Sequence, residues 1–176
     1  QLQKSSIAHL HMQHLTGKPS HVAIYIDEKG ERTIIGLSED RLEVVTLAGA
    51  NLRSGDIVVF HLWRDHFRND LDLAKKAGCI TVVGVEALKS DITADIAIGS
   101  HVDIDSQIDV SAYLSRFERI VITEGSRGAA EYSPSGCTFQ EALKVEAFDA
   151  TGAGDAFLAG YITAVASEIE DAQTRL

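Results

Sequence analysis

The stretch Phe148-Asp149-Ala150-Thr151-Gly152-Ala153-Gly154-Asp155-Ala156-Phe157 decides how the rest of the chain is interpreted. Apolar residues after it recur at the helical spacing i, i+3, i+4 and i+7: Leu158, Tyr161, Ile162 and Val165. This pattern predicts a helix that starts near Asp155. The first turn of a helix has free N–H groups and the positive end of the helix dipole, and glycines let an anion approach the backbone closely.

Asp155 would therefore lie beside a site that favours negative charge. Its carboxylate cannot bind an anion, but it can accept a proton from a hydroxyl group that attacks a phosphate. The alternative is an ordinary Gly-rich turn in which Asp155 only caps the helix, because short glycine motifs are weak evidence by themselves.

The segment Asp149-Ala150-Thr151-Gly152-Ala153-Gly154-Asp155-Ala156-Phe157 resembles the C-terminal signature of the ribokinase-like (PfkB) family of sugar and nucleoside kinases. That signature is usually written Asp-Thr-x-Gly-Ala-Gly-Asp-x-Phe, so Ala150 is its one loose position. A second segment, Ile122-Thr123-Glu124-Gly125-Ser126-Arg127-Gly128-Ala129, resembles the family's nucleotide-binding Thr-x-Gly-x-x-Gly turn. The two motifs stand in the family's order and at its spacing.

The resemblance implies an α/β fold, a doubly wound and mostly parallel sheet flanked by helices, with part of a small β lid. It also implies an ATP-dependent carbohydrate kinase that phosphorylates a hydroxyl of a sugar or sugar acid. A nucleoside kinase of the same fold is one alternative. Another is a non-catalytic protein that only binds a sugar or a nucleotide.

Family positions also imply roles for individual residues. Asp155 is the base, and the amides of Gly152, Ala153 and Gly154 stabilise the transferred phosphoryl group. The residues expected to line the nucleotide are Thr123, Gly125, Ser126, Arg127 and Gly128. Arg127 can contact a phosphate, although an exposed arginine on a turn is an equal alternative.

Metal ligands are expected at three positions. Asp149 and Thr151 match positions that help to hold a monovalent cation, K⁺, in some family members. Mg²⁺ is expected to arrive with ATP. The family's Asn-x-x-Glu motif is replaced here by Ser100-His101-Val102-Asp103, so Asp103 takes the place of the glutamate with a shorter reach.

Composition excludes several classes of protein. Of the 176 residues, 45% are hydrophobic and 24% are charged, which is ordinary for a globular protein. The net charge of −10 argues against a broad nucleic-acid-binding or membrane-binding surface. Two cysteines without metal spacing favour a cytoplasmic location. We expect a sugar and ATP as partners, with a homodimer left open as an assembly.

Strand and helix patterns alternate along the chain. A hairpin is expected from the β-rich runs at 22–26 and 32–35, and a second one around residues 133–136. Strands are expected at 57–60, 80–85, 96–98 and 119–123, with helices near 67–77 and 108–117. We expect one domain over residues 1–176, incomplete at both ends, since the family's N-terminal sugar-binding motif has no match here.

Three residues after the buried strand 57–60 are further candidates for contact with a substrate. In an open α/β sheet, residues that follow the carboxyl end of a strand line the ligand crevice. His61, Trp63 and Arg64 stand there. The alternatives are packing of Trp63 within its loop and exposure of Arg64 to solvent.

Overall fold

A computed structural model describes residues 22–26, 32–36, 46–105, 107–145 and 149–176. The chain divides into two compact units, residues 1–46 and 47–176. In the first unit, strands β1 (Val22–Ile26) and β2 (Arg32–Gly36) form an antiparallel two-stranded sheet in which Val22 pairs with Gly36. The predicted hairpin is thus confirmed. Its five-residue loop lies outside the described residues, and its role as a lid stays a prediction.

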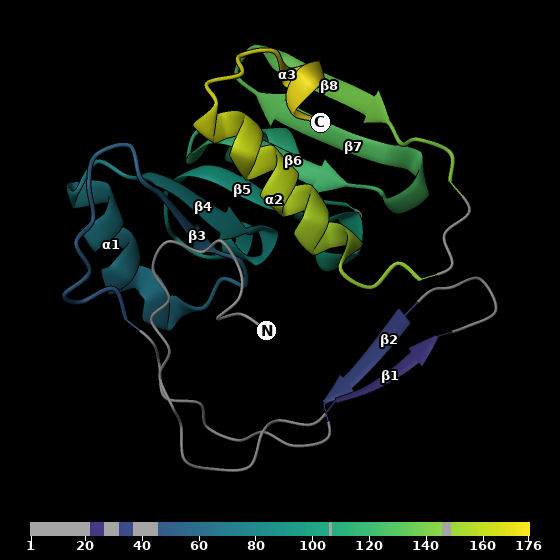
Figure 1. Ribbon diagram of the computed structural model, residues 1–176, viewed down its shortest axis with the longest axis horizontal. Helices are drawn as coiled ribbons and strands as arrows, with labels where there is room; N and C mark the ends of the chain where they lie inside the picture. Colours follow the sequence, from purple (N-terminus) through teal and green to yellow (C-terminus); the bar gives the residue numbers. More distant parts are fainter. Residues whose placement is uncertain (1–21, 27–31, 37–45, 106, 146–148) are drawn as a thin grey trace, which may run out of the picture. The chain divides into compact units, whose positions relative to one another are not determined.

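The second unit is built on a six-stranded sheet with the order β3-β4-β5-β6-β7-β8 (Figure 1). Its strands are β3 (Ile57–Phe60), β4 (Ile80–Gly84), β5 (Ala94–Ser100), β6 (Phe117–Thr123), β7 (Gly128–Ser133) and β8 (Gly136–Glu141). The first four strands run parallel, and β7 and β8 add an antiparallel hairpin at one edge. The near-continuous Val and Ile runs of β4 and β6 suit strands that are covered on both faces.

Side chains from the parallel strands alternate between two cores, as the twofold period of a strand requires. One core holds Val83, Ala97 and Ile120 and is closed by helix α1 (Arg68–Lys76) through Leu71 and Ala74. The other holds Val82, Ile96, Ile98 and Val121, and helix α2 (Ala153–Ala166) covers it through Tyr161. Figure 1 shows α2 lying across the strands. Helices therefore flank both faces of a mostly parallel sheet, as predicted.

The remaining helical segments are short. They are η2 (Asp65–Phe67), η3 (Val85–Lys89), η4 (His101–Asp103), η5 (Val110–Tyr113), η6 (Gly125–Arg127) and α3 (Ala172–Arg175). The helix predicted over 108–117 is wrong: only a 3₁₀ segment forms, capped by Asp109, which accepts a hydrogen bond from the Ser111 amide at 3.0 Å. Phe117 already belongs to β6. Among the described helices, none is long and apolar enough to cross a membrane.

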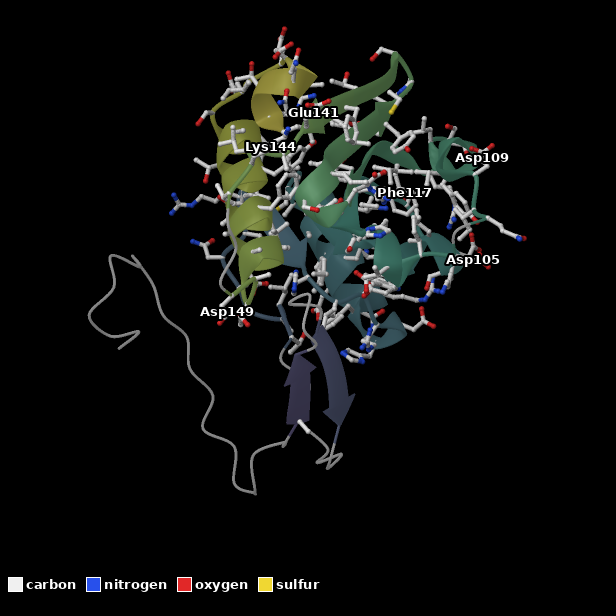
Figure 2. The ribbon with its side chains drawn as sticks, turned by 90° about the vertical axis from the view of Figure 1, so that its right-hand side faces the viewer. Asp105, Asp109, Phe117, Glu141, Lys144 and Asp149 are labelled. Carbon is white, nitrogen blue, oxygen red and sulfur yellow. The ribbon has the colours of Figure 1, made fainter. Side chains whose placement is uncertain are left out.

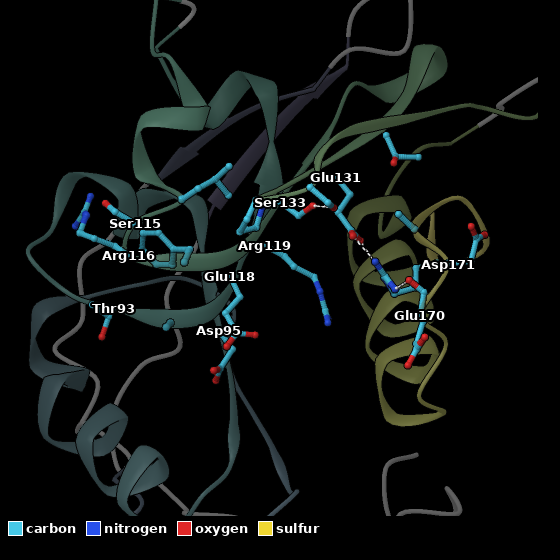
Figure 3. A pocket seen from close by; sticks show the side chains of 18 of the residues that line it. Thr93, Asp95, Ser115, Arg116, Glu118, Arg119, Glu131, Ser133, Glu170 and Asp171 are labelled. Carbon is cyan, nitrogen blue, oxygen red and sulfur yellow. Dashed lines mark hydrogen bonds and ion pairs between the residues drawn. The ribbon is translucent and has the colours of Figure 1, made fainter.

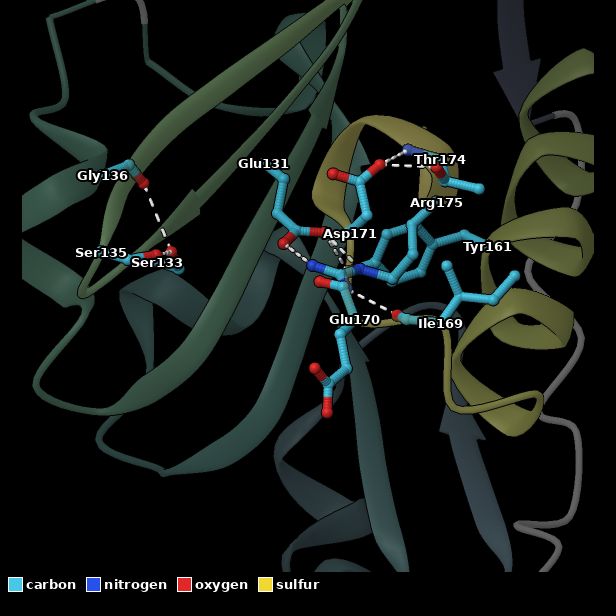
Figure 4. Close-up of polar contacts among 10 residues, drawn as sticks. All are labelled: Glu131, Ser133, Ser135, Gly136, Tyr161, Ile169, Glu170, Asp171, Thr174 and Arg175. Atoms are coloured by element: carbon cyan, nitrogen blue, oxygen red, sulfur yellow. Dashed lines mark hydrogen bonds and ion pairs between the residues drawn. The ribbon is translucent and has the colours of Figure 1, made fainter.

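A buried polar network ties the end of the chain to the sheet (Figure 4). The Glu131 carboxylate, on β7, accepts a hydrogen bond from the Tyr161 hydroxyl at 2.7 Å and from Arg175 Nε at 3.0 Å. Arg175 Nη2 pairs with the other carboxylate oxygen, and Arg175 Nη1 donates to the Ile169 carbonyl at 2.6 Å. Burial raises the pKa of the Tyr161 phenol, and the hydrogen bond to Glu131 raises it further. The network joins β7, α2 and α3.

Candidate functional site

Helix α2 begins at Ala153, two residues before the predicted start. Gly152 is its N-cap and has φ +80°, the left-handed conformation that glycine adopts without a steric penalty. Before the cap, the Asp149 carboxylate accepts a hydrogen bond from the Thr151 amide at 2.8 Å. Figure 2 shows Asp149 at the foot of α2. Asp155 lies in the first turn, so the structure places the predicted base beside the amino end of this helix.

The amides at this helix end are largely free. Within the described residues, the Gly152, Gly154 and Asp155 N–H groups have no hydrogen-bond partner, whereas the Ala153 amide donates to the Ala150 carbonyl at 3.1 Å. A side chain added at Gly152 or Gly154 would meet no atom within 4 Å, so the space around both is open. Free donors, the helix dipole and open space together suit an anion.

Asp155 faces His61, the residue that directly follows β3. The His61 Nε2 lies 3.4 Å from Asp155 Oδ1, and both side chains are exposed, at 56% and 73%. One of the three substrate-contact candidates after β3 is therefore beside the predicted base. Trp63 is only 3% exposed and donates its Nε1 hydrogen to Ser90 Oγ at 3.1 Å, so it packs in the core. Arg64 is exposed and donates to the Trp63 carbonyl.

The predicted nucleotide turn begins where β6 ends. Thr123 Oγ1 donates to the Gly99 carbonyl at 3.3 Å, and the Glu124 amide donates to the Gly128 carbonyl at 2.7 Å, which closes the turn. Gly125 has φ +60° and open space around it. Gly128 has φ +134°, and a Cβ there would lie 2.0 Å from the Gln140 carbonyl oxygen. Gly128 is therefore required by the packing of β7 against β8.

Two other predicted residues of this turn lie at its surface. Ser126 is exposed, and the Arg127 side chain is 65% exposed. Arg127 Nε forms an ion pair with Glu124 Oε2 at 3.0 Å. The Glu124 side chain is 28% exposed, and partly exposed pairs of this kind contribute little to stability.

The two parts of the predicted site lie at the carboxyl ends of different strands of the sheet. His61 follows β3, and Thr123 ends β6, three strands away. With a spacing of ~4.8 Å between neighbouring strands, the two strand ends are roughly 14 Å apart. A ligand that contacts both the turn at 123–128 and Asp155 must therefore be extended along the carboxyl edge.

The predicted metal ligands are not gathered into one cluster. Asp103 closes a capping box with Ser100, whose amide donates to Asp103 Oδ2 at 3.3 Å. Asp149 holds the turn before α2, as described above. In the part of the chain that the structure describes, no group of three or more His, Cys, Asp or Glu side chains is arranged to hold a metal ion. The cation sites at Asp103, Asp149 and Thr151 stay predictions.

A hollow lies near the amino ends of the parallel strands (Figure 3). Its volume is about 1010 Å³, and residues near the amino ends of β5 and β6 line it, among them Thr93, Asp95, Phe117 and Arg119. Many of its charged groups already have partners, as Glu131 and Arg175 do. Since ligands of open α/β sheets bind outside the carboxyl ends of the strands, we place the functional site at the α2 end and not in this hollow.

Comparison with known proteins gives the class of the molecule. The profile of the pfkB family of carbohydrate kinases matches residues 1–174. The chain belongs to this family, as the two glycine motifs predict.

Solved structures agree on the fold. A fructokinase from Vibrio cholerae O395, in a form with fructose, ADP and calcium, superposes with a TM-score of 0.73 at 18% identity, over 94% of this chain and 64% of that one. A putative ribokinase from Agrobacterium tumefaciens gives 0.66 at 21% identity, over 89% and 57%. A nucleoside kinase from Methanocaldococcus jannaschii gives 0.57 at 18%, over 86% and 56%. The chain thus spans less than two thirds of each of these proteins.

Proposed function

We propose that this chain transfers the γ-phosphate of ATP to a hydroxyl group of a sugar or sugar acid, with Asp155 as the general base. The observation that carries the proposal is the amino end of α2, where free amides and an exposed carboxylate lie side by side. Phosphoryl transfer needs a positioned nucleophile and neutralised charge more than it needs covalent chemistry from the protein. This helix end can supply both.

The amides of Gly152 and Gly154 stabilise charge on the transferred phosphoryl group. They have no partner among the described residues and need not break an existing bond to do so. Such preorganised donors are usually the largest electrostatic contribution to catalysis. The Ala153 amide already donates to the Ala150 carbonyl, so we propose that it contributes less than the other two amides.

The nucleotide is proposed to bind at Thr123, Gly125, Ser126, Arg127 and Gly128. Open space at Gly125 and the exposed Arg127 guanidinium support this placement. Mg²⁺ bound to ATP would neutralise phosphate charge, and Asp103 offers it one exposed carboxylate, while Asp149 and Thr151 are proposed for K⁺. Oxygen ligands of this kind suit such hard cations.

A sugar is favoured as the acceptor over a nucleoside. The family is one of carbohydrate kinases, and the fructokinase that superposes with a TM-score of 0.73 was crystallised with fructose and ADP.

The free thiols of Cys79 and Cys137 support a cytoplasmic location. Light scattering on the purified chain would distinguish a monomer from a homodimer.

The test is ADP release against a panel of sugars, sugar acids and nucleosides, repeated with Asp155→Asn. Loss of the base should lower kcat by roughly 10²–10⁴-fold. The Michaelis constants should change much less, because Asn still hydrogen-bonds a hydroxyl. Asp72→Asn, at an exposed position of α1, is the matched control and should leave turnover unchanged.

Two results would contradict the proposal. Near-normal turnover of Asp155→Asn would leave Asp155 as a helix-start residue only, since Asn and Asp serve almost equally there. Binding of ATP and a sugar without any ADP release from the full-length protein would favour the non-catalytic alternative.

A further inference from the structure

We infer that His61 is a positioning residue that holds the Asp155 carboxylate ready to accept the substrate proton. The inference rests on the proposed function of Asp155. Its starting point is the contact of 3.4 Å between His61 Nε2 and Asp155 Oδ1. The two residues are far apart in the sequence, and they meet because β3 ends where α2 begins.

The backbone of His61 is held by an aromatic cluster on either side of it. Phe60, Trp63 and Phe67 pack against one another with ring-centre separations of 5.5–6.5 Å. Phe60 and Trp63 are buried, and the Trp63 side chain is also hydrogen-bonded to Ser90. His61 and Leu62 thus form a short exposed segment between two buried residues. The buried neighbours fix the position of the His61 backbone, and with it the point from which the imidazole extends.

The backbone of Gly84 packs closely against the same segment. A Cβ at Gly84 would lie 2.6 Å from the His61 carbonyl oxygen and 3.3 Å from the Trp63 amide nitrogen. Its φ of −65° would suit any residue, so close packing, and not backbone strain, is what excludes a side chain here. The same point lies 2.3 Å from Glu86 Oε2, a buried oxygen without a hydrogen-bond partner in the described part of the chain.

The chemistry divides the two oxygens of Asp155 between two tasks. His61 Nε2 faces Oδ1 and can donate a hydrogen bond to it, which leaves Oδ2 for the acceptor hydroxyl. The hydroxyl proton passes to Oδ2, and the hydroxyl oxygen forms its bond to the γ-phosphorus. The bond between that phosphorus and the bridging oxygen breaks, and its electron pair leaves with ADP. At 3.4 Å the contact is longer than an ideal N–H···O bond, and apo contacts of this kind often tighten when the substrate binds.

The contact itself can be tested without turnover. In NMR spectra at constant pH, Asp155→Asn should shift the imidazole resonances of His61 and leave those of His66 and His101 in place. The His66 ring lies against the Phe67 ring, and His101 faces the Thr123 carbonyl. Both histidines are exposed, and neither is paired with Asp155. Unchanged His61 resonances would overturn the inference.

The positioning role is tested with a double-mutant cycle in the kinase assay. His61→Phe keeps a ring and removes the N–H donor, so kcat should fall by roughly 10-fold while the KM for ATP stays constant. His61→Gln restores an N–H group and should recover most of the rate. In the Asp155→Asn background, His61→Phe should change kcat by less than about twofold, because the two residues act as one unit. His66→Phe is the matched control.

Failure of this inference can be distinguished from failure of the proposed function. If Asp155→Asn lowers kcat as predicted but His61→Phe is silent, or lowers kcat by the same factor in both backgrounds, only the role of His61 is overturned. If Asp155→Asn turns over normally, or the full-length protein releases no ADP with any acceptor, both the proposed function and this inference are overturned.

Gly84→Ala provides an independent test of the positioning. The added methyl group must displace the His61 carbonyl, so kcat should fall as it does in His61→Phe while circular dichroism still reports a folded chain. Normal kcat in a folded Gly84→Ala variant would contradict the claim that the packed loop places His61.

Discussion

Substituting Glu131 with Gln should strongly destabilise the sheet unit. Glu131 and Arg175 side chains are 2% and 5% exposed, so the change leaves a guanidinium buried without its counter-charge. The new amide NH₂ would also face donors, since Glu131 accepts from both Tyr161 and Arg175 (Figure 4). Breaking a buried pair by removing one partner typically costs about 3–5 kcal/mol.

We expect a loss of about 4 kcal/mol in the free energy of unfolding, a large part of the ~5–15 kcal/mol typical of a domain. The midpoint of thermal unfolding should fall by roughly 10–20 °C. Urea titrations followed by fluorescence of the single tryptophan, Trp63, report the change because this residue is buried in the sheet unit.

Two comparisons sharpen this test. Glu118→Gln changes an exposed glutamate of β6 and should alter the free energy of unfolding by less than about 0.5 kcal/mol. Replacing Glu131 and Arg175 together with Leu and Met should cost less than Glu131→Gln, because no unpaired charge remains. A loss below about 1 kcal/mol for Glu131→Gln would refute the reasoning, since a pair worth so little behaves as an exposed one.

Three further predictions follow from burial and backbone conformation. Burial raises the pKa of the Tyr161 phenol, so the neutral phenol contributes its full stabilisation below the unfolded pKa of about 10, and this stabilisation is lost as the pH rises above that value. The free energy of unfolding of Tyr161→Phe should lack this alkaline loss. The same pH dependence in both proteins would contradict the prediction. Burial raises the pKa of the Cys79 thiol, whereas Cys137 is exposed, so a thiol reagent at neutral pH should modify Cys137 first, as mass mapping of the labelled peptides would show. Gly125→Ala should weaken ATP binding, measured by calorimetry, while Gly49→Ala, at a left-handed glycine with equally open surroundings, should not; equal affinities would place the nucleotide elsewhere.

Local pattern in the sequence was enough to predict most of the fold. The Val and Ile runs predict β3, β4 and β6, and the two glycine motifs predict the family and the start of α2 to within two residues. These features are local, because strand period, helix period and glycine turns depend on neighbouring residues. The helix predicted at 108–117 does not form, because local pattern does not report tertiary packing. That packing and the early start of β6 override a weak apolar period.

Only the tertiary structure decided which distant side chains meet. The sequence places His61 after a strand, but its contact with Asp155 depends on the end of β3 lying beside the start of α2. Nothing in the sequence marked Glu131 as the partner of Tyr161 and Arg175, which lie 30 and 44 residues away. Glutamate is usually found at the surface, and Glu131 is at the centre of a buried network only because α2 and α3 pack over it. The residue types and the glycine turns are thus set by the sequence, whereas the pairing of charges is set by the packing of α2 and α3 on the sheet.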